Sequence, residues 1–205
     1  TSSVNSEGKS YVATNLAISL SLLHKKVALV GLDIRKPMLA KYLNLPTKGC
    51  VTSYLSDASY TVDDLIVASE FKGLDILPAG AIPPNPSELL QSQRLDELFA
   101  ELRKRYDYVV IDSAPVAMVS DTFLLNRVAD LTVYVSRARY TTTNLIDFIK
   151  QVHEQKRLPN IVTVLNGVGT TKKGYGYGYG YGYGYGYGYG HHIDKKKKWW
   201  QLKKA

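Results

Sequence analysis

The sequence predicts an α/β fold in which a mostly parallel, doubly wound sheet carries helices on both faces, followed by a low-complexity C-terminal tail. Three observations predict it. Short apolar runs of strand length alternate with stretches of helical periodicity along residues 1–171. A Gly-Lys-Ser tripeptide at positions 8–10 stands directly ahead of the first helical stretch. Glycine and tyrosine then alternate strictly over residues 174–190, a composition that marks a separate segment.

The expected helices and strands follow from the spacing of apolar residues. After the tripeptide, apolar side chains recur at helical spacing: Val12, Ala13, Leu16, Ala17, Leu20 and Leu23. Residues 27–30 form a continuous apolar run, which is typical of a strand buried on both faces of a parallel sheet. Similar runs predict further strands at 74–77, 108–111, 131–135 and 161–165.

Two further helices are expected between these strands. Asn85 caps the first, Pro86 occupies its first turn, and Glu88 reaches back from the third position. The buried face of that helix, or helix pair, is expected to comprise Leu89, Leu90, Leu95, Leu98 and Phe99. The second helix is expected over residues 142–155.

Polar residues gather where the strands end. Asp33, Asp112 and Asn166 each follow an apolar run. Ligands of doubly wound folds bind outside the carboxyl ends of the strands. These three side chains therefore mark the expected site, and Asn166 either hydrogen-bonds an adenine edge or is a strand-end amide in a turn.

The tripeptide is interpreted as the end of a phosphate-binding loop (P-loop). The nucleotide-binding residues predicted there are Glu7, Gly8, Lys9, Ser10 and Tyr11. Backbone N–H groups would cradle the phosphates, and Lys9 would neutralise them. The strict pattern fails because Ser3 replaces its first glycine, so a capped helix with a chance Gly-Lys-Ser is the alternative. Two strand-end aspartates opposite the loop favour the phosphate site.

The same constellation predicts a Mg-ATP site. Ser10, Asp33 and Asp112 are the expected Mg²⁺ ligands, directly or through water. Lys9, Asp33 and Asp112 are the expected catalytic residues. The alternative for Asp112 is a turn-forming aspartate at the end of a strand.

Charge separates the body from the tail. Of the net charge of +8, the tail after Thr171 carries eight lysines and one aspartate, hence 8 − 1 = +7, which leaves 8 − 7 = +1 for residues 1–171. A nearly neutral body argues against a nucleic-acid partner. The lone Cys50 excludes an internal disulfide framework. Because Thr1 already lies in the phosphate loop, the strand that should feed this loop is expected upstream, and the sequence is interpreted as a fragment.

With these residues in view, the sequence resembles the catalytic domain of the bacterial tyrosine kinases (BY-kinases) of capsule and exopolysaccharide export. The resemblance covers residues 1–190 and rests on these stretches: Thr1-Ser2-Ser3 through Glu7-Gly8-Lys9-Ser10; Leu32-Asp33-Ile34-Arg35-Lys36-Pro37; Gly80 with Pro83-Pro84-Asn85-Pro86-Ser87-Glu88-Leu89-Leu90; Tyr106-Asp107-Tyr108-Val109-Val110-Ile111-Asp112; and Val164-Leu165-Asn166-Gly167-Val168. The Pro-Pro-Asn-Pro-Ser-Glu-Leu-Leu segment is the most specific of them.

The resemblance implies an ATP-dependent protein-tyrosine autokinase that controls polysaccharide polymerisation and export. It implies a ring-shaped homo-oligomer, a membrane activator domain, fused upstream or separate, a protein-tyrosine phosphatase as partner, and a location at the cytoplasmic face of the bacterial inner membrane. The implied phosphoacceptors form the tail: Tyr175, Tyr177, Tyr179, Tyr181, Tyr183, Tyr185, Tyr187 and Tyr189. The expected divisions are a kinase domain over 1–171, the Tyr/Gly phosphoacceptor tail over 172–190 and a basic segment over 191–205.

Three departures from the family pattern bear on activity. Gly31 stands where the family usually carries the first of two aspartates, so Asp33 would share the metal-binding and base duties. Asn5 and Ser6 replace the usual Pro-Gly of the loop. The helix through which family members form rings lies upstream of the phosphate loop and is not in this sequence. Since phosphoryl transfer asks little of a base, reduced activity is expected rather than none.

Other interpretations stay open. The chain is alternatively a nucleotide-switched assembly or partition-type ATPase with an adhesive or membrane-tethering tail, although Val4 stands where those ATPases carry a signature lysine. A weakly catalytic regulatory module is the third interpretation. The tail itself is alternatively a low-complexity segment or a stacking surface for nucleic acid, and residues 191–205 are a solvated terminus or a membrane contact.

Overall fold

The sheet is split into two parts. The computed structural model describes residues 1–43, 45 and 49–169. A four-stranded sheet has the order β2-β3-β1-β4, and a two-stranded sheet pairs β5 with β6. The strands are β1 Val27–Leu32, β2 Val67–Ala68, β3 Leu74–Leu77, β4 Tyr108–Ser113, β5 Thr132–Arg137 and β6 Ile161–Asn166. All pairings are parallel except that of the edge strand β2. The predicted α/β class and mostly parallel sheet are confirmed.

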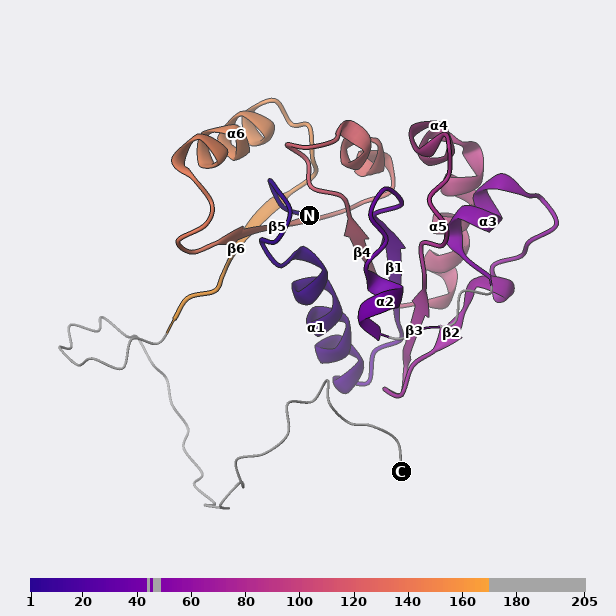
Figure 1. Ribbon diagram of the computed structural model, residues 1–205. Helices are drawn as coiled ribbons and strands as arrows, with labels where there is room; N and C mark the ends of the chain where they lie inside the picture. The colour runs from indigo at the N-terminus through magenta and orange to yellow at the C-terminus, as the bar shows by residue number, and fades with distance from the viewer. Residues whose placement is uncertain (44, 46–48, 170–205) are drawn as a thin grey trace, which may run out of the picture. The chain divides into compact units, whose positions relative to one another are not determined.

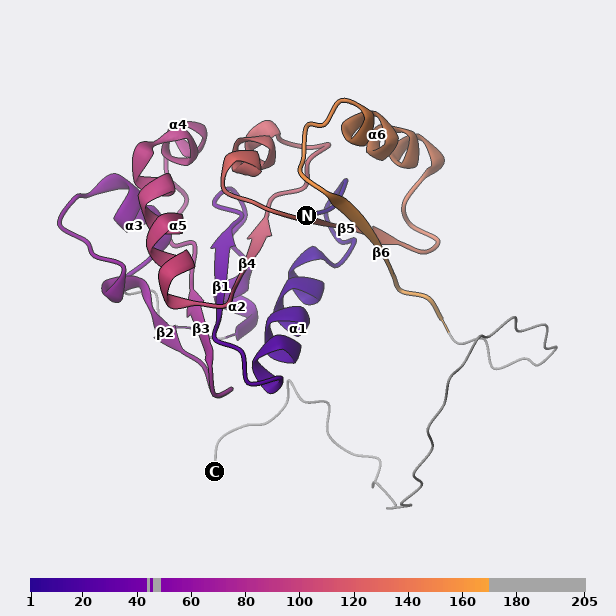
Figure 2. The ribbon, with the colours of Figure 1, turned by 180° about the vertical axis from the view of Figure 1, so that it is seen from behind.

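Helices cover both faces of the four-stranded sheet (Figures 1 and 2). The described helices are α1 Lys9–Leu22, α2 Leu39–Leu43, α3 Val51–Ser56, α4 Pro86–Gln91, α5 Gln93–Arg105 and α6 Thr143–Glu154, with 3-10 turns η1 Asp63–Leu65 and η2 Ser120–Arg127. Of these, α6 packs against β5 of the two-stranded sheet. The helix pair α4–α5 and the helix α6 confirm their predictions. The short elements α2, α3 and β2 have no periodic pattern and were not predicted.

Strand β1 packs against helices on both faces of the four-stranded sheet. Ala28, Val30 and Leu32 pack with α3, α4 and α5, whereas Val27 and Leu29 pack with α1 and α2. Successive side chains of a strand point to opposite faces, so every residue of a central strand must be apolar or small. All six residues of β1 are buried accordingly. This packing fixes the carboxyl end of β1, where Asp33 follows.

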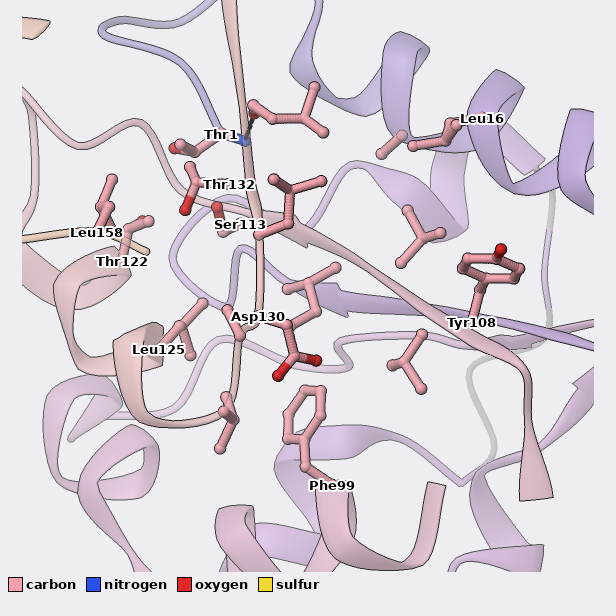
Figure 3. Close-up of a pocket in the computed structure, with 18 of the residues that line it drawn as sticks. Thr1, Leu16, Phe99, Tyr108, Ser113, Thr122, Leu125, Asp130, Thr132 and Leu158 are labelled. Atoms are coloured by element: carbon pink, nitrogen blue, oxygen red, sulfur yellow. Dashed lines mark hydrogen bonds between the residues drawn. The ribbon is translucent and has the colours of Figure 1, made fainter. Parts of the chain in front are cut away.

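A slot separates β4 from β5 (Figure 3). It has a volume of about 710 Å³, and apolar side chains from α1, α5 and η2 point into it, among them Leu16, Phe99 and Leu125. Of the apolar residues at helical spacing in α1, Leu16 is 39% exposed because it faces this slot, and Leu23 lies exposed at the C-cap of the helix.

Residues 1 and 2 bridge the upper end of the slot. The amide of Val135 donates to the carbonyl of Thr1 at 2.9 Å, and the amide of Val116 donates to the carbonyl of Ser2 at 2.9 Å. Ser2 thereby forms a parallel bridge with Val135. The start of the phosphate loop is thus held between the two sheets.

Candidate functional site

The phosphate loop turns into α1 through a backbone conformation that favours glycine. Gly8 is the N-cap of α1 and has φ 103° and ψ 19°. A Cβ atom at this position would lie 2.1 Å from Nδ2 of Asn166. Both the positive φ and the close contact therefore require glycine at position 8. Ser6, two residues earlier, also has a positive φ of 66°.

Glu7 is the buried residue that stabilises the phosphate loop by hydrogen bonds. Its side chain is fully buried, and one carboxylate oxygen accepts a hydrogen bond from the amide of Val4 at 2.8 Å. The hydroxyl of Thr141 donates to the other oxygen. The carbonyl of Glu7 accepts a hydrogen bond from Nδ2 of Asn166 at 2.9 Å. Glu7 thus holds the loop to itself and to the segments that follow β5 and β6.

Strand β5 adds two more contacts to the loop. The hydroxyls of Ser3 and Tyr134 lie 3.0 Å apart, both fully buried. Burial raises the pKa of Tyr134 to about 12, so this hydroxyl keeps its proton at neutral pH. Arg137, at the end of β5, donates from Nη1 to the carbonyl of Ser6 at 2.8 Å. The two-stranded sheet therefore shapes the loop that the four-stranded sheet carries.

Lys9 and Asp33 form an ion pair at the carboxyl end of β1. Nζ of Lys9 lies 3.0 Å from Oδ2 of Asp33, and both side chains are largely buried, at 13% and 6% exposed. The other oxygen, Oδ1, accepts a hydrogen bond from the amide of Lys36 at 3.0 Å. The amide of Asp33 donates to the carbonyl of Asp112 at 3.0 Å, which joins the ends of β1 and β4.

Asp112 completes the charged cluster. Burial raises the pKa of Asp112, while the Lys9 charge and a hydrogen bond from Ser10 act in the opposite direction. Oδ1 of Asp112 has no hydrogen-bond donor within the part of the chain that the structure describes. A buried carboxylate oxygen without a donor costs free energy unless a cation or a water binds it.

The donor set fits Mg²⁺. Two carboxylates, of Asp33 and Asp112, and the hydroxyl of Ser10 are hard oxygen ligands, which Mg²⁺ prefers. Mg²⁺ keeps several waters and is bound by one or two carboxylates together with substrate phosphates. The three side chains stand at the N-terminus of α1, where backbone N–H groups favour phosphate. Oδ1 of Asp112, which has no donor among the residues that the structure describes, is the observation that supports this fit.

The structure brings most of the predicted site residues together. Lys9, Ser10, Asp33 and Asp112 meet at one edge of the sheet, with Glu7 and Gly8 behind them. Tyr11 lies on the first turn of α1 with its side chain 58% exposed. Tyr175, Tyr177, Tyr179, Tyr181, Tyr183, Tyr185, Tyr187 and Tyr189, and the segment 191–205, lie outside the described residues.

Asn166 uses its side chain within the protein. Nδ2 donates to Glu7, and Oδ1 accepts from the amide of Gly167 at 2.8 Å. In this arrangement Asn166 positions the phosphate loop. Contact of the same side chain with an adenine edge stays a prediction.

Sequence reasoning missed the residues that hold the loop from β5. Arg137 is the last residue of β5, and Asp33 and Asp112 lie at the carboxyl ends of β1 and β4, so a search for polar residues at strand ends could have found it. Tyr134 and Thr141 carry no such signal, since a buried tyrosine and a loop threonine are common in any α/β domain.

Comparison with known proteins decides the family. Residues 6–162 match the family model described as AAA domain. The kinase domain of VpsO is 34% identical, covers 82% of this chain and 83% of that chain, and superimposes with a TM-score of 0.75. The tyrosine-protein kinase CpsD of Streptococcus agalactiae is 30% identical over 170 residues, which are 82% of this chain and 74% of that protein. The chain belongs to the AAA domain family and, within it, to the bacterial tyrosine kinases.

Other relatives of this kinase-family domain are much longer. The tyrosine-protein kinase ptk of Acinetobacter johnsonii is 33% identical over 168 residues, which are 82% of this chain and 23% of that protein. The chain thus spans about a quarter of the length of the first curated relatives it matches. The septum site-determining protein MinD of Pyrococcus horikoshii OT3 shares the fold, with 20% identity and a TM-score of 0.63. In the described ranges, no helix combines the length and apolarity needed to cross a membrane.

Proposed function

We propose that this chain is a Mg-ATP-dependent protein-tyrosine kinase that phosphorylates its own C-terminal tyrosine run. The observation that carries the proposal is the meeting of Lys9, Asp33 and Asp112 beside the phosphate loop, where one oxygen of Asp112 has no donor among the described residues. The names of the relatives support the reaction, because VpsO, CpsD and ptk are described as kinases. The Mg-ADP bound to MinD supports nucleotide and magnesium as ligands of this fold.

Each site residue has a distinct role in the proposed reaction. Lys9 binds the β- and γ-phosphates, for which it has to exchange its ion pair with Asp33. Ser10, Asp33 and Asp112 would hold Mg²⁺, directly or through water, and the ion would neutralise charge on the phosphates when bound. Asp33 orients the acceptor hydroxyl and takes its proton. The phosphorus–oxygen bond to ADP breaks as the bond to the tyrosine oxygen forms.

The proposed acceptors are the eight tyrosines at positions 175–189. A stretch of about 16 residues reaches at most about 55 Å when fully extended, which would let the acceptors reach the site of a neighbouring copy. Each phosphotyrosine adds about −1.5 to −2 charges, so about four or five of them cancel the tail charge of +7. We infer a graded switch in which unmodified tails assemble and phosphorylated tails dissociate. If a variant with all eight tyrosines changed to phenylalanine still dissociates on adding ATP, the switch is wrong.

The test of the kinase is mass spectrometry of tail peptides after incubation of the protein with Mg-ATP. Phosphate on the tail tyrosines that disappears in Lys9→Met is the expected result. A matched control is Lys26→Met, because Lys26 lies ahead of β1 at the opposite end of the strand from the site. Bare tyrosines in a protein that binds ATP would contradict the proposal.

A nucleotide-switched assembly ATPase is the second candidate. It is favoured by the shared fold of MinD, at 20% identity. Release of inorganic phosphate without phosphotyrosine would support this candidate over the kinase. The residue at position 4 counts against it, because Val4 cannot supply a cation to the phosphates.

The cellular setting is part of the same proposal. We place the kinase at the cytoplasmic face of a bacterial inner membrane, as a homo-oligomer with a membrane activator domain and a phosphatase partner, in control of capsule or exopolysaccharide export. The relatives include a putative tyrosine-protein kinase in the cps region of Klebsiella pneumoniae, 34% identical over 161 residues. Deleting the chain's gene in its host is expected to change the length or amount of surface polysaccharide, and Lys9→Met is expected to reproduce that change.

A further inference from the structure

Asp121 is a buried carboxylate that the proposed reaction does not use. It stands at the start of η2 and is 2% exposed. Its Oδ1 accepts hydrogen bonds from the hydroxyl of Ser87 at 2.8 Å and from Nη2 of Arg35 at 3.1 Å. Nε of Arg35 pairs with the other oxygen, and Nη2 of Arg35 also donates to Ser87 Oγ at 3.0 Å. The three side chains form a closed cluster, here called the Arg35 anchor.

The anchor joins three segments that are far apart in the sequence. Arg35 comes from the loop after β1, Ser87 from the first turn of α4, and Asp121 from η2. A bidentate pair between a guanidinium and a carboxylate fixes orientation as well as distance. Burial alone would raise the pKa of Asp121, but the hydrogen bonds from Arg35 and Ser87 and the Arg35 charge outweigh it and lower that pKa. Asp121 is therefore ionised, and the pair is fully charged.

Arg35 lies inside the turn that aims Asp33. The amide of Lys36 donates to Oδ1 of Asp33, so the backbone of residues 33–36 closes around Arg35. The opposite oxygen of Asp33 meets Lys9 at 3.0 Å. Holding the side chain of Arg35 restrains this turn, and the turn sets the direction of the Asp33 carboxylate.

The contact of Ser87 with Asp121 explains why a serine stands in the segment 83–90, the most specific part of the family resemblance. In the stretch 83–90, Leu89 and Leu90 are core residues, and Nδ2 of Asn85 donates to Glu88 at 2.8 Å. These contacts make a helix start and a buried face, and they leave the serine unexplained. The serine side chain instead donates to Asp121. The segment thereby connects the start of α4 to the catalytic side of the sheet.

We propose that Arg35, Ser87 and Asp121 are positioning residues that hold the Asp33 carboxylate against Lys9. The proposal deepens the proposed function, because it concerns the same site. Its first consequence needs no nucleotide: in the metal-free protein, loss of the anchor frees Lys9 from its ion pair. Its second consequence is a weaker site for Mg²⁺ with nucleotide, since Asp33 is one of the proposed ligands.

The test measures how fast an amine-reactive acetylating reagent modifies Lys9 in the full chain, read by mass spectrometry. Arg35→Lys keeps the charge and loses the fork, and Ser87→Ala removes one donor. We expect Lys9 to react about threefold to tenfold faster in both variants, as for the loss of one or two hydrogen bonds. Asp121→Asn is the third variant, and if it does not fold, the other two still decide.

Arg127→Lys is the matched control. Arg127 also lies on η2 and makes the same kind of contacts, with Asp96 at 2.7 Å and with the carbonyl of Leu90 at 2.8 Å, but it does not contact the loop after β1. A role in stability alone would change the labelling of Lys9 equally in Arg127→Lys and in the anchor variants after matching for urea midpoint. That result, or unchanged labelling in the anchor variants, would overturn the proposal.

Two readouts keep this proposal separate from the kinase itself. If the anchor variants change Lys9 labelling and no variant, wild type included, forms phosphotyrosine, the anchor stands and the kinase fails. If phosphotyrosine forms and Lys9 labelling is unchanged, the anchor fails and the kinase stands. Where both stand, the Mg²⁺ concentration for half-maximal binding of a fluorescent ATP analogue is expected to rise in Ser87→Ala and to stay at the wild-type value in Arg127→Lys.

Discussion

Replacing Gly8 by alanine tests the geometry of the phosphate loop. The added Cβ would lie 2.1 Å from Nδ2 of Asn166, so the side chain of Asn166 has to move and its hydrogen bond to Glu7 is lost. The backbone at position 8 also has a φ of 103°, which an L-residue adopts at a cost. The substitution therefore disturbs the loop in two independent ways.

The clash and the backbone conformation together determine how much Gly8→Ala lowers the free energy of unfolding. A non-glycine residue at positive φ costs about 1–2 kcal/mol. The lost hydrogen bond adds about 0.5–1.5 kcal/mol. The expected loss in free energy of unfolding is therefore about 1.5–3.5 kcal/mol, a large part of the roughly 5–15 kcal/mol of a typical domain. Nucleotide binding is expected to fall further, because Gly8 belongs to the loop that is proposed to bind phosphate.

Urea denaturation and binding of a fluorescent ATP analogue measure both effects. Gly169→Ala is the control, since a Cβ at position 169 meets no atom within 4 Å. Adding Asn166→Ala to Gly8→Ala removes the clash with the amide, and is expected to leave the backbone cost together with the loss of the hydrogen bond from Asn166 to Glu7. A Gly8→Ala protein with wild-type stability and wild-type nucleotide affinity would refute the reasoning.

Three further predictions follow from the same site. Gly31→Asp is expected to destabilise the fold by about 1–3 kcal/mol in urea and to leave the rate of phosphotyrosine formation no higher, because its Cβ would lie 3.0 Å from the backbone amide of Ala79. Asp112→Asn is expected to stabilise the metal-free protein at pH 7 and to weaken Mg²⁺ binding, both measured by thermal unfolding with and without Mg-ATP. Tyr134→Phe is expected to cost about 1–3 kcal/mol in urea, because it leaves the buried Ser3 hydroxyl without its partner.

The expected stabilisation of the metal-free protein by Asp112→Asn follows from the raised pKa of Asp112. An acid with a higher pKa in the folded state than in the unfolded state stabilises the fold at low pH, and this contribution is lost as pH rises through the folded pKa. Ionised Asp112 therefore destabilises the metal-free fold at neutral pH. Since protons compete with Mg²⁺, the Mg²⁺ requirement of the wild type is expected to rise from pH 7 to pH 5. A requirement independent of pH over this range would count against Asp112 as a ligand.

Tyr134→Phe and Gly31→Asp each have a control variant. Tyr140→Phe is the match for Tyr134→Phe, since Tyr140 is 47% exposed and its ring contact with Arg137 survives the loss of the hydroxyl. Gly31→Ala separates the volume of the new side chain from its charge. If Gly31→Asp raises the rate of phosphotyrosine formation without loss of stability, the crowding argument is wrong.

The central strands and their polar ends were predictable because each obeys a single local rule. A run buried on both faces, such as Val27–Leu32, has to be apolar throughout, and the first polar residue after it stands at the carboxyl edge of the sheet. Asp33 and Asp112 were found in this way. The parallel topology then brings them within reach of Lys9 without further information.

The contacts that shape the loop were not predictable, because they join residues with no shared local pattern. The pairing of Ser3 with Tyr134 spans 131 positions, and that of Glu7 with Thr141 spans 134. Helix α3 escaped prediction because four of its six residues are buried, which leaves no amphipathic period to detect. The Arg35 anchor is invisible for the same reason, since its three residues lie on three separate segments.

The dependence of the phosphate loop on β5 and β6 has a consequence for folding. The loop leaves the ribosome before its partner Asn166, which is translated 159 positions after Glu7. At about 5–20 residues per second, the loop waits roughly 8–32 seconds for that partner. The apolar core around β1 and β4 can form in this interval, but a nucleotide site cannot. A nascent chain halted before β6 is expected to be folded in part and unable to retain ATP, so nucleotide capture reports completion of the domain.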